Sequence, residues 1–247
     1  MTERKIVLVA AGNSELGRPI TEFLLAQKEF EIFATFRTDS ETATDLKNLF
    51  EDRAPSHCLK TDLRDSNQVT SLFSRISSSG QIWGVLNFAG EATANRLVRA
   101  TQNEIENSIL NNLMPAINLT TEFFKYAKEK AIPGGRLVHI SSVTVRRPVP
   151  GTIPYVIAKS GIEGLVKASA EEAGRFKVAI NALRLGYFDR GMATRAVPRE
   201  MLSEISKSTA TRSLGTPENL FAAISYLLAE ESAFHTGSII DLDGGLV

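Results

Sequence analysis

The chain has 247 residues, of which 43% are hydrophobic and 23% charged, as is usual for a globular protein with a large core. Its formal net charge is zero, so the charge balance favours neither nucleic acid nor an anionic membrane as a partner. The single cysteine, Cys58, excludes an internal disulfide and a multi-cysteine metal site. The three histidines, His57, His139 and His235, show no metal-ligand spacing, so no metal is expected.

Short apolar runs alternate with helical patterns along the whole chain. Strands are expected at 5–11, 30–36, 56–60, 82–88, 135–141, 177–184 and 237–242. Helices are expected at about 15–28, 41–53, 66–78, 101–131, 152–175 and 217–230. Strands rich in Val, Ile, Leu and Phe between helices are typical of parallel β-α-β units. Because no linker or repeat divides the chain, residues 1–247 are predicted to form a single α/β domain. It would be a doubly wound Rossmann-type domain with a seven-stranded parallel sheet flanked by helices.

The N-terminus is a charged start to the first strand. Its apolar run is too short to span a bilayer and does not have the pattern of a secretory signal. A cytoplasmic protein without membrane partners is therefore expected.

The first strand leads into a turn with the sequence Ala10-Ala11-Gly12-Asn13-Ser14-Glu15-Leu16-Gly17. Small residues and Gly between a strand and a helix are typical of the place where a dinucleotide pyrophosphate meets a helix N-terminus. Contacts to such a cofactor are predicted from Gly12, Asn13, Ser14, Leu16 and Gly17. Only two of these positions are glycine, so a tight turn that serves helix–sheet packing alone is the alternative.

The second strand ends in Ala34-Thr35-Phe36-Arg37-Thr38. An acidic residue here would bind the ribose hydroxyls of NAD, whereas an arginine accommodates the 2′-phosphate of NADP. Arg37 therefore favours NADP(H), with NAD(H) as the alternative if Arg37 is only a solvated side chain.

A serine, a tyrosine and a lysine near the middle of the chain form the candidate catalytic group. Tyr155 and Lys159 are four residues apart, so one helical turn places them on the same face. An ammonium beside a phenol should lower the phenol pKa toward the working pH, where it exchanges protons with a carbonyl or alcohol oxygen. Ser142, at the end of an apolar strand, would donate a hydrogen bond to the same oxygen. The group predicts carbonyl/alcohol redox chemistry with a hydride carrier.

The segment 185–216 fits the alternation least well. It contains Gly186, Gly191, Pro198 and Gly215 around a short helical pattern at 199–207. A long irregular insertion after a strand is often a lid over the site, and an irregular surface loop is the alternative.

Further motifs occur in the order and spacing of the short-chain dehydrogenase/reductase family, which the chain resembles from its first strand to its last residues. They are Asp62-Leu63, Asn87-Phe88-Ala89-Gly90, Asn112-Leu113, Ile140-Ser141-Ser142, Arg212 to Glu218, and Thr236-Gly237-Ser238 through Asp243-Gly244-Gly245.

This resemblance implies a nicotinamide-dependent enzyme whose catalytic residues are Asn112, Ser142, Tyr155 and Lys159. It implies cofactor contacts from Gly12, Asn13, Ser14, Leu16, Gly17, Arg37, Asp62, Leu63, Asn87, Ala89, Gly90, Tyr155, Lys159 and Gly186. Tyr155 would donate a proton to the carbonyl oxygen, Ser142 would stabilise the developing charge, and Lys159 would hold the nicotinamide ribose. Asn112 would anchor a water, and Pro115 would break the long helix beside it.

Several residues depart from the family pattern. Glu15 replaces a glycine, and its carboxylate would repel a pyrophosphate unless it points outward. Ser14 stands where a basic residue often supports NADP binding, Phe88 replaces an asparagine, and Leu185 replaces a proline. The catalytic residues are thus complete, whereas the cofactor residues differ from the pattern.

The leading hypothesis is NADPH-dependent reduction of a ketone, with a 3-oxoacyl-thioester as the nearest family analogue, free or carrier-bound. The alternatives are an NAD(P)-dependent alcohol, sugar or steroid-type dehydrogenase, and a non-catalytic nucleotide-binding regulatory protein. Arg146 and Arg147 could contact a substrate carboxylate or phosphate, although a solvated basic loop is the preferred interpretation.

A homo-oligomer, tetramer or dimer, is expected from the long helices at 101–131 and 152–175. An apolar face could come from Ala116, Ile117, Leu119, Phe123 and Phe124, or the same stripe could be core.

Overall fold

The computed structural model describes residues 4–51, 54, 57–92 and 94–246. Its centre is a seven-stranded sheet in the order β3-β2-β1-β4-β5-β6-β7, in which every neighbouring pair is parallel. The strands are Lys5–Ala10 (β1), Glu31–Phe36 (β2), Cys58–Lys60 (β3), Gln81–Asn87 (β4), Gly135–Ser142 (β5), Val178–Leu185 (β6) and Ile239–Leu242 (β7). The predicted seven-stranded parallel sheet is confirmed.

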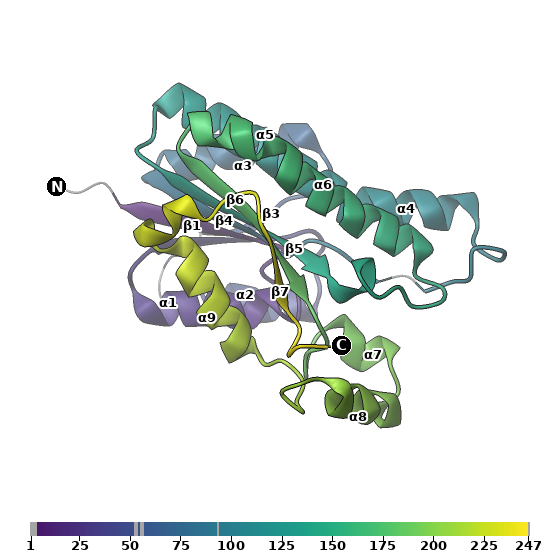
Figure 1. Cartoon of the computed structure of the whole chain (residues 1–247). Helices are drawn as coiled ribbons and strands as arrows, with labels where there is room; N and C mark the ends of the chain where they lie inside the picture. Colours follow the sequence, from purple (N-terminus) through teal and green to yellow (C-terminus); the bar gives the residue numbers. More distant parts are fainter. Residues whose placement is uncertain (1–3, 52–53, 55–56, 93, 247) are drawn as a thin grey trace.

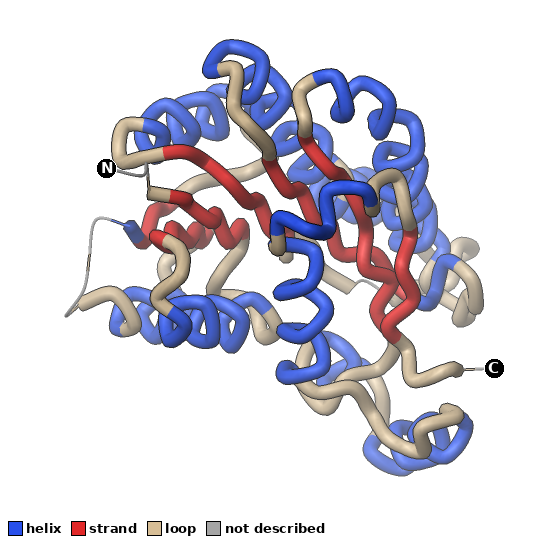
Figure 2. Tube along the Cα trace, turned by 60° about the vertical axis from the view of Figure 1, so that its left-hand side comes forward, coloured by secondary structure: helices blue, strands red, loops and turns tan. Residues whose placement is uncertain are grey.

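Two layers of helices cover the sheet, as Figures 1 and 2 show. The helices are Gly17–Gln27 (α1), Glu41–Asn48 (α2), Ser66–Ser77 (α3), Gln102–Asn112 (α4), Met114–Lys130 (α5), Ile153–Arg175 (α6), Met192–Ala196 (α7), Arg199–Ser208 (α8) and Pro217–Leu228 (α9). Side chains alternate along β1, so Ile6 and Leu8 pack with α3, α5 and α6, whereas Val7 and Val9 pack with α1, α2 and α9. In the described ranges, no helix combines the length and the apolar character needed to cross a membrane.

The strand order reverses beside β1. The chain passes from β1 outward to β2 and β3, then returns to β4 on the other side of β1. Loops that leave β1 and β4 therefore diverge, and a crevice opens at the carboxyl ends of these strands, where ligands bind in doubly wound sheets. The predicted nucleotide turn and the Asn87-Phe88-Ala89-Gly90 motif lie on its two sides.

The helix predicted at 101–131 is two helices that meet at Leu113. A capping box of Thr101 and Glu104 starts α4. Pro115 lies in the first turn of α5, where its missing N–H leaves the carbonyl of Asn111 without the usual helical donor. The expected break beside Pro115 is present, and it ends α4 at Asn112.

The segment 185–216 lies below the sheet and contains α7 and α8 (Figure 1). The helical pattern at 199–207 corresponds to α8, and α7 is an additional helix. A single bridge between Phe188 and Gly215 closes the base of the segment.

Candidate active site

The turn after β1 is packed tightly against β2. The Ala11 N–H donates to Thr35 Oγ1 (3.0 Å) and the Gly12 N–H donates to the Thr35 carbonyl (2.8 Å). A Cβ on Gly12 would lie 3.0 Å from the Ala34 Cβ, and a Cβ on Gly17 would lie 2.6 Å from the Ala11 carbonyl oxygen. These two positions therefore require glycine, and they bring the N-terminus of α1 to the crevice.

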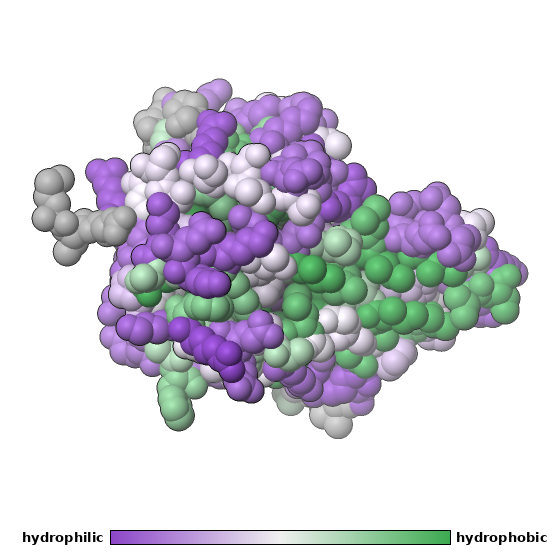
Figure 3. Space-filling model, turned by 90° about the horizontal axis from the view of Figure 1, so that it is seen from above, coloured by the Kyte–Doolittle hydropathy of each residue, from purple (hydrophilic) through white to green (hydrophobic). Residues whose placement is uncertain are grey.

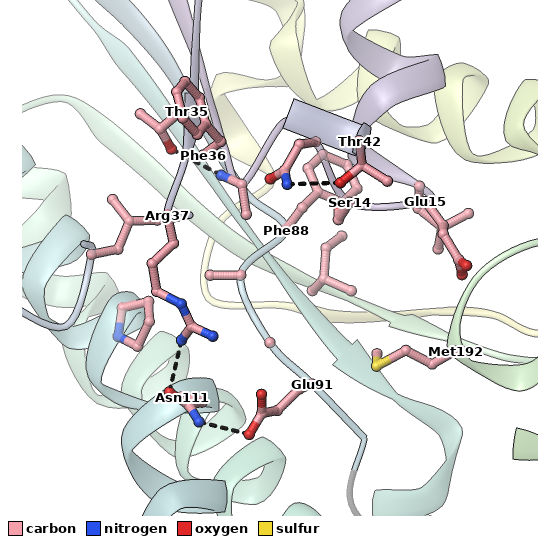
Figure 4. A pocket seen from close by; sticks show the side chains of 18 of the residues that line it. Ser14, Glu15, Thr35, Phe36, Arg37, Thr42, Phe88, Glu91, Asn111 and Met192 are labelled. Carbon is pink, nitrogen blue, oxygen red and sulfur yellow. Dashed lines mark hydrogen bonds between the residues drawn. The ribbon is translucent and has the colours of Figure 1, made fainter. Parts of the chain in front are cut away.

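A cavity of about 340 Å³ fills this crevice (Figure 4). Its wall comes from the turn after β1, the ends of β2, β3 and β4, the junction of α4 and α5, and the start of α7. The predicted cofactor residues in the wall are Asn13, Ser14, Leu16, Arg37, Asp62, Leu63, Ala89, Gly90 and Lys159. Arg37, the turn that leads into α1 and Lys159 all border this cavity, and together they offer the cations and the helix N-terminus that a dinucleotide needs.

The other predicted cofactor residues lie behind the wall. Gly12 and Gly17 shape the turn, as described above. Gly186 packs against Asp243, where a Cβ would lie 2.6 Å from the Asp243 Cα. Asn87 is buried, and its Oδ1 accepts the Ala89 N–H (3.0 Å).

The Glu15 carboxylate is turned toward the segment that contains α7. Glu15 Oε1 lies 3.0 Å from the Arg195 Nε, and Glu15 Oε2 is buried and has no hydrogen-bond partner among the described residues. The ion pair offsets the negative charge that would repel a pyrophosphate. It also joins the nucleotide turn to α7, a contact between residues 180 positions apart that local sequence does not reveal.

Also in the cavity wall, Arg64 holds Asp62. The Arg64 Nη2 donates to Asp62 Oδ2 (2.6 Å), and its Nε donates to both carboxylate oxygens (2.9 and 3.1 Å). These bonds lower the pKa of Asp62. Arg37 is exposed to the cavity and donates to Asn111 Oδ1 (2.9 Å). Arg64 and Asn111 were not predicted, and their only sequence signal is that each lies within two residues of a predicted one.

His139 supports the end of β4. It lies beside Asn87 in the sheet, and Asn87 Nδ2 donates to its Nδ1 (3.1 Å) while its Nε2 lies 2.9 Å from Thr120 Oγ1. A neutral ring with the proton on Nε2 satisfies both contacts. Complete burial, together with the charge of Lys159, lowers the pKa of His139 to about 3. The sequence assigned no role to His139, and the structure shows that it orients Asn87.

Asn112 and Lys159 meet at Gly90. The Asn112 side chain accepts the Glu91 N–H (3.1 Å) and donates to the Glu91 and Ser108 carbonyls (3.0 and 2.8 Å). A Cβ on Gly90 would lie 2.6 Å from Asn112 Oδ1 and 3.3 Å from the Lys159 Nζ, and Gly90 has φ +153°. Only glycine leaves room for both side chains.

Tyr155 and Lys159 lie on successive turns of α6, as expected. The Lys159 Nζ is 5.6 Å from the Tyr155 ring centroid and donates to the Ile140 carbonyl (2.9 Å). The expectation that Lys159 lowers the Tyr155 pKa is wrong for this structure. Burial raises it to about 12, and a hydrogen bond from Ser142 opposes this only in part. Burial also lowers the pKa of Lys159 to about 8, because an ammonium loses its hydration there.

Ser142 ends β5 beside these residues. Its Oγ accepts hydrogen bonds from the Thr144 hydroxyl (2.9 Å) and the Thr144 N–H (3.3 Å). Both bonds use the lone pairs of the oxygen, so the Ser142 hydrogen remains free to donate to Tyr155 or to a substrate oxygen. Thr144 was not predicted, and it orients the serine.

Arg146, in the following loop, is neither free for a substrate nor merely solvated. It binds Asp241 (2.9 Å), Asp243 (2.6 Å) and the Leu246 carbonyl (3.1 Å). These contacts fasten the loop after Ser142 to the last residues of the chain.

Comparison with known proteins assigns the family. Residues 10–247 match the family model described as enoyl-(acyl carrier protein) reductase, a short-chain dehydrogenase/reductase model. The chain belongs to the short-chain dehydrogenase/reductase family. It is an NAD(P)-dependent short-chain oxidoreductase.

Relatives of this short-chain oxidoreductase include ketoreductases. The chain is 28% identical to the acetoacetyl-CoA reductase of Acinetobacter sp. (strain RA3849), over 100% of this chain and 99% of the relative. It is 30% identical to a 3-oxoacyl-(acyl-carrier-protein) reductase of Chlamydia muridarum, over 69% of this chain and 68% of the relative.

Two solved structures share the fold of this short-chain oxidoreductase. An actinorhodin polyketide ketoreductase variant with NADPH has a TM-score of 0.88 and 21% identity, covering 98% of this chain and 97% of that chain. A putative gluconate dehydrogenase from Agrobacterium tumefaciens has a TM-score of 0.87 and 23% identity, covering 98% and 95%.

Proposed function

We propose that this enzyme uses NADPH to reduce a ketone, with a substrate that resembles a 3-oxoacyl thioester. The observation that carries the proposal is a chain of contacts beside the cavity: Ser142 bonds to Tyr155, Tyr155 lies next to Lys159, and Lys159 and Asn112 meet at Gly90 in the cavity wall. The acetoacetyl-CoA and 3-oxoacyl reductases among the relatives support this substrate class. An NAD(P)-dependent alcohol, sugar or steroid-type dehydrogenase with the same four residues is the second candidate.

A bound nicotinamide cofactor would supply the hydride for the carbonyl carbon, and this chain's residues supply the proton for the oxygen. A Tyr155 pKa near 12 keeps the phenol protonated, as a proton donor in the reducing direction must be. Tyr155 gives its proton to the carbonyl oxygen, Ser142 donates a hydrogen bond to the same oxygen, and the product is the alcohol.

Lys159 and Asn112 support this transfer. The Lys159 ammonium, held at the Ile140 carbonyl, lies where it can stabilise the Tyr155 anion that remains after proton transfer, and it would hold the cofactor ribose. The Lys159 pKa of about 8 makes it suited to return a proton to Tyr155 near neutral pH. Asn112 fixes the Glu91 backbone, and we propose that it also anchors the water that connects Lys159 with solvent.

NADP(H) is the proposed cofactor, with NAD(H) as the alternative. Arg37 lies in the cavity wall, and in the described part of the chain its charge is not paired with a carboxylate. A 2′-phosphate would pair with such a cation through charge-assisted hydrogen bonds, whereas an uncharged ribose hydroxyl would leave the Arg37 charge unpaired.

The segment 185–216 is the proposed lid. Gly191 packs beside Leu16 and Glu15 in the nucleotide turn, and Met192 and Arg195 line the cavity. The lid thus touches the cofactor cavity directly. Together with residues 1–184 and 217–247, it would complete the single domain that the sequence predicts.

Self-association is proposed through the long helices α4 and α6. Ala116, Leu119 and Phe123 of the predicted stripe are fully buried in the core of the chain itself, whereas Ile117 and Phe124 are partly exposed. Figure 3 shows hydrophobic residues gathered toward one end of the molecule. Large exposed hydrophobic side chains on α4, α6 and their flanking loops are Leu97, Val98, Leu110, Val149, Ile153 and Ile157. A patch of this kind is typical of a protein interface, and a cytoplasmic homo-oligomer remains the expectation.

The test is a titration with NADPH and NADH, followed by an assay with acetoacetyl-CoA and with simple secondary alcohols. We expect tighter binding of NADPH and consumption of NADPH only when the thioester is present. Failure of both nucleotides to bind below millimolar concentration contradicts the enzyme mechanism. Turnover of the alcohols with NAD, and none of the thioester, favours the second candidate.

A further inference from the structure

Asn111 lies between Arg37 and the Glu91 carboxylate in the wall of the cavity (Figure 4), and Arg64 also borders this cavity. The Asn111 Oδ1 accepts hydrogen bonds from the Arg37 Nη1 (2.9 Å) and the Arg64 Nη1 (3.0 Å). Its Nδ2 donates to Glu91 Oε1 (2.6 Å). One neutral amide therefore separates two positive groups from a negative one.

These contacts allow only one orientation of the amide. If it were turned over, the Asn111 NH₂ group would face two guanidinium groups that only donate, and its oxygen would face the Glu91 carboxylate that only accepts. Glu91 on one side and the arginines on the other thus hold the amide in place.

The charges around Asn111 are not equivalent. Arg64 is paired with Asp62 through three side-chain hydrogen bonds, and Lys60 is paired with Asp39 (2.5 Å). Within the described ranges, Arg37 has the Asn111 amide as its hydrogen-bond partner and makes no ion pair. The pKa of Asp62 is lowered mainly by Arg64, which makes the direct ion pair, and also by the charge of Arg37. Arg37 is therefore the cation near the end of β2 that an anionic ligand can pair with directly.

The nearby Glu91 carboxylate would otherwise compete for that cation. It shares Asn111 with Arg37 and with Arg64. The pKa of Arg64 is raised by its hydrogen bonds to Asp62 and also by the Glu91 charge. Removal of the amide would leave the carboxylate facing both guanidinium groups, of which Arg64 is already paired with Asp62. A direct Glu91–Arg37 ion pair would then use the charge that a phosphate needs, and it would draw Arg37 away from its place in the wall.

We propose that Asn111 determines cofactor specificity by keeping Glu91 apart from Arg37, so that Arg37 stays available for the 2′-phosphate of NADP(H). The inference rests on the proposed function, since it concerns the same cofactor site. Asn111 acts through Arg37 and is a positioning residue.

The test measures the dissociation constants of NADPH and NADH for wild type, Asn111→Ala, Glu91→Gln and the double variant by fluorescence titration. Asn111→Ala should weaken NADPH binding about tenfold and change NADH binding by less than about twofold, because NADH lacks the 2′-phosphate. Glu91→Gln alone should change the NADPH constant by less than about twofold, since the Gln oxygen still accepts the Asn111 N–H. In the double variant most of the NADPH affinity should return, because the competing charge is gone.

Asn103→Ala, at an exposed position in the first turn of α4, is the matched control and should leave both constants unchanged. Asn111→Ser is a second variant that should reproduce the selective loss if Asn111→Ala does not fold. An equal loss of NADPH and NADH affinity would indicate a merely structural role and overturn the inference. Failure of Glu91→Gln to restore binding in the double variant would overturn it as well. A wild-type enzyme that does not prefer NADPH contradicts the proposed cofactor, whereas a wild-type preference that survives Asn111→Ala contradicts this inference alone.

Discussion

Lys159 and Arg37 border the same cavity, and the surroundings of these two cations differ; the parts of the cavity around them are called the Lys159 end and the Arg37 end. Lys159 is 2% exposed and is held by the Ile140 carbonyl at the end of β5. Arg37 is exposed and is held by the side chain of Asn111. Lys159 is thus a buried side chain held by a backbone carbonyl, and Arg37 is an exposed side chain held by another side chain.

This difference indicates which property of the enzyme, turnover or cofactor affinity, depends on each end. A buried, hydrogen-bonded group keeps its geometry without a ligand, and its low-dielectric surroundings strengthen electrostatic effects on a reacting oxygen. Ion pairs between partly exposed side chains are screened by salt, and they exchange partners readily when an anion arrives. We therefore expect substitutions at the Lys159 end to change turnover, and substitutions at the Arg37 end and the lid to change cofactor affinity.

The largest effect should follow Tyr155→Phe, which removes the proton donor and keeps the ring. We expect kcat to fall about a thousandfold while the NADPH dissociation constant stays within about twofold. Steady-state kinetics and a fluorescence titration measure the two quantities. Tyr226→Phe, at an exposed position on α9, is the matched control. Near-normal turnover in Tyr155→Phe would remove Tyr155 from its proposed role.

Acid should lower the free energy of unfolding through His139, whose pKa is lowered by burial and by the Lys159 charge. The pKa of His139 is about 3 in the folded protein and near 6.5 in the unfolded chain, so the unfolded chain binds the extra proton in this window. The stability that depends on neutral His139 is complete above the unfolded pKa and is lost as pH falls toward the folded value. Between about pH 7 and about pH 5 the expected loss in the free energy of unfolding is about 2 kcal/mol. Denaturant unfolding of wild type and His139→Gln at both pH values measures it, and an equal loss in both proteins would contradict the prediction.

At the other end of the cavity, Arg37→Ala should weaken NADPH binding about tenfold or more, with little change for NADH. The physical reason is the loss of the cation that a 2′-phosphate requires. Dissociation constants of both nucleotides provide the measurement, and Arg175→Ala at the exposed end of α6 is the control. Parallel weakening of both nucleotides would mean that Arg37 shapes the cavity without reading the phosphate.

The smallest effect is expected at the Glu15–Arg195 contact, because Arg195 is 70% exposed and its ion pair is screened. Arg195→Ala should weaken NADPH binding about threefold at low salt, since it leaves the Glu15 charge beside the pyrophosphate site. The double variant with Glu15→Gln should bind as wild type does. Titrations at two salt concentrations measure this. If the loss persists in the double variant, Arg195 does not act by offsetting Glu15.

Much of the catalytic end could be predicted from the sequence because its pattern is local. Tyr155 and Lys159 are one helical turn apart, and Ser142 ends an apolar strand, so short-range geometry already brings them to the same edge of the sheet. The supporting residues His139 and Thr144 carry no such pattern. Their roles depend on strand register and on burial, which a single sequence does not specify.

The cofactor end was less predictable. Arg37 was recognised by its place after β2, but its partner Asn111 lies 74 residues further along the chain. Glu15 was expected to repel a pyrophosphate unless its side chain points outward, and the sequence did not predict that Arg195 of α7 pairs with it. The apolar stripe from Ala116 to Phe124 had the pattern of an interface or of core. In the structure, α5 packs against the sheet and buries Ala116, Leu119 and Phe123 of this stripe in the core.

The amino-acid sequence by itself determined the alternation of strands and helices, the parallel sheet and the proposed group of Ser142, Tyr155 and Lys159, because these follow from local periodicity and spacing, while Asn112 was added by the family resemblance. Only the tertiary structure decided the direction of the Tyr155 pKa, the partner of Glu15 and the separation of Glu91 from Arg37. These properties depend on desolvation and on charges that distant segments bring together, and both arise when the crossovers of the sheet close around the cavity.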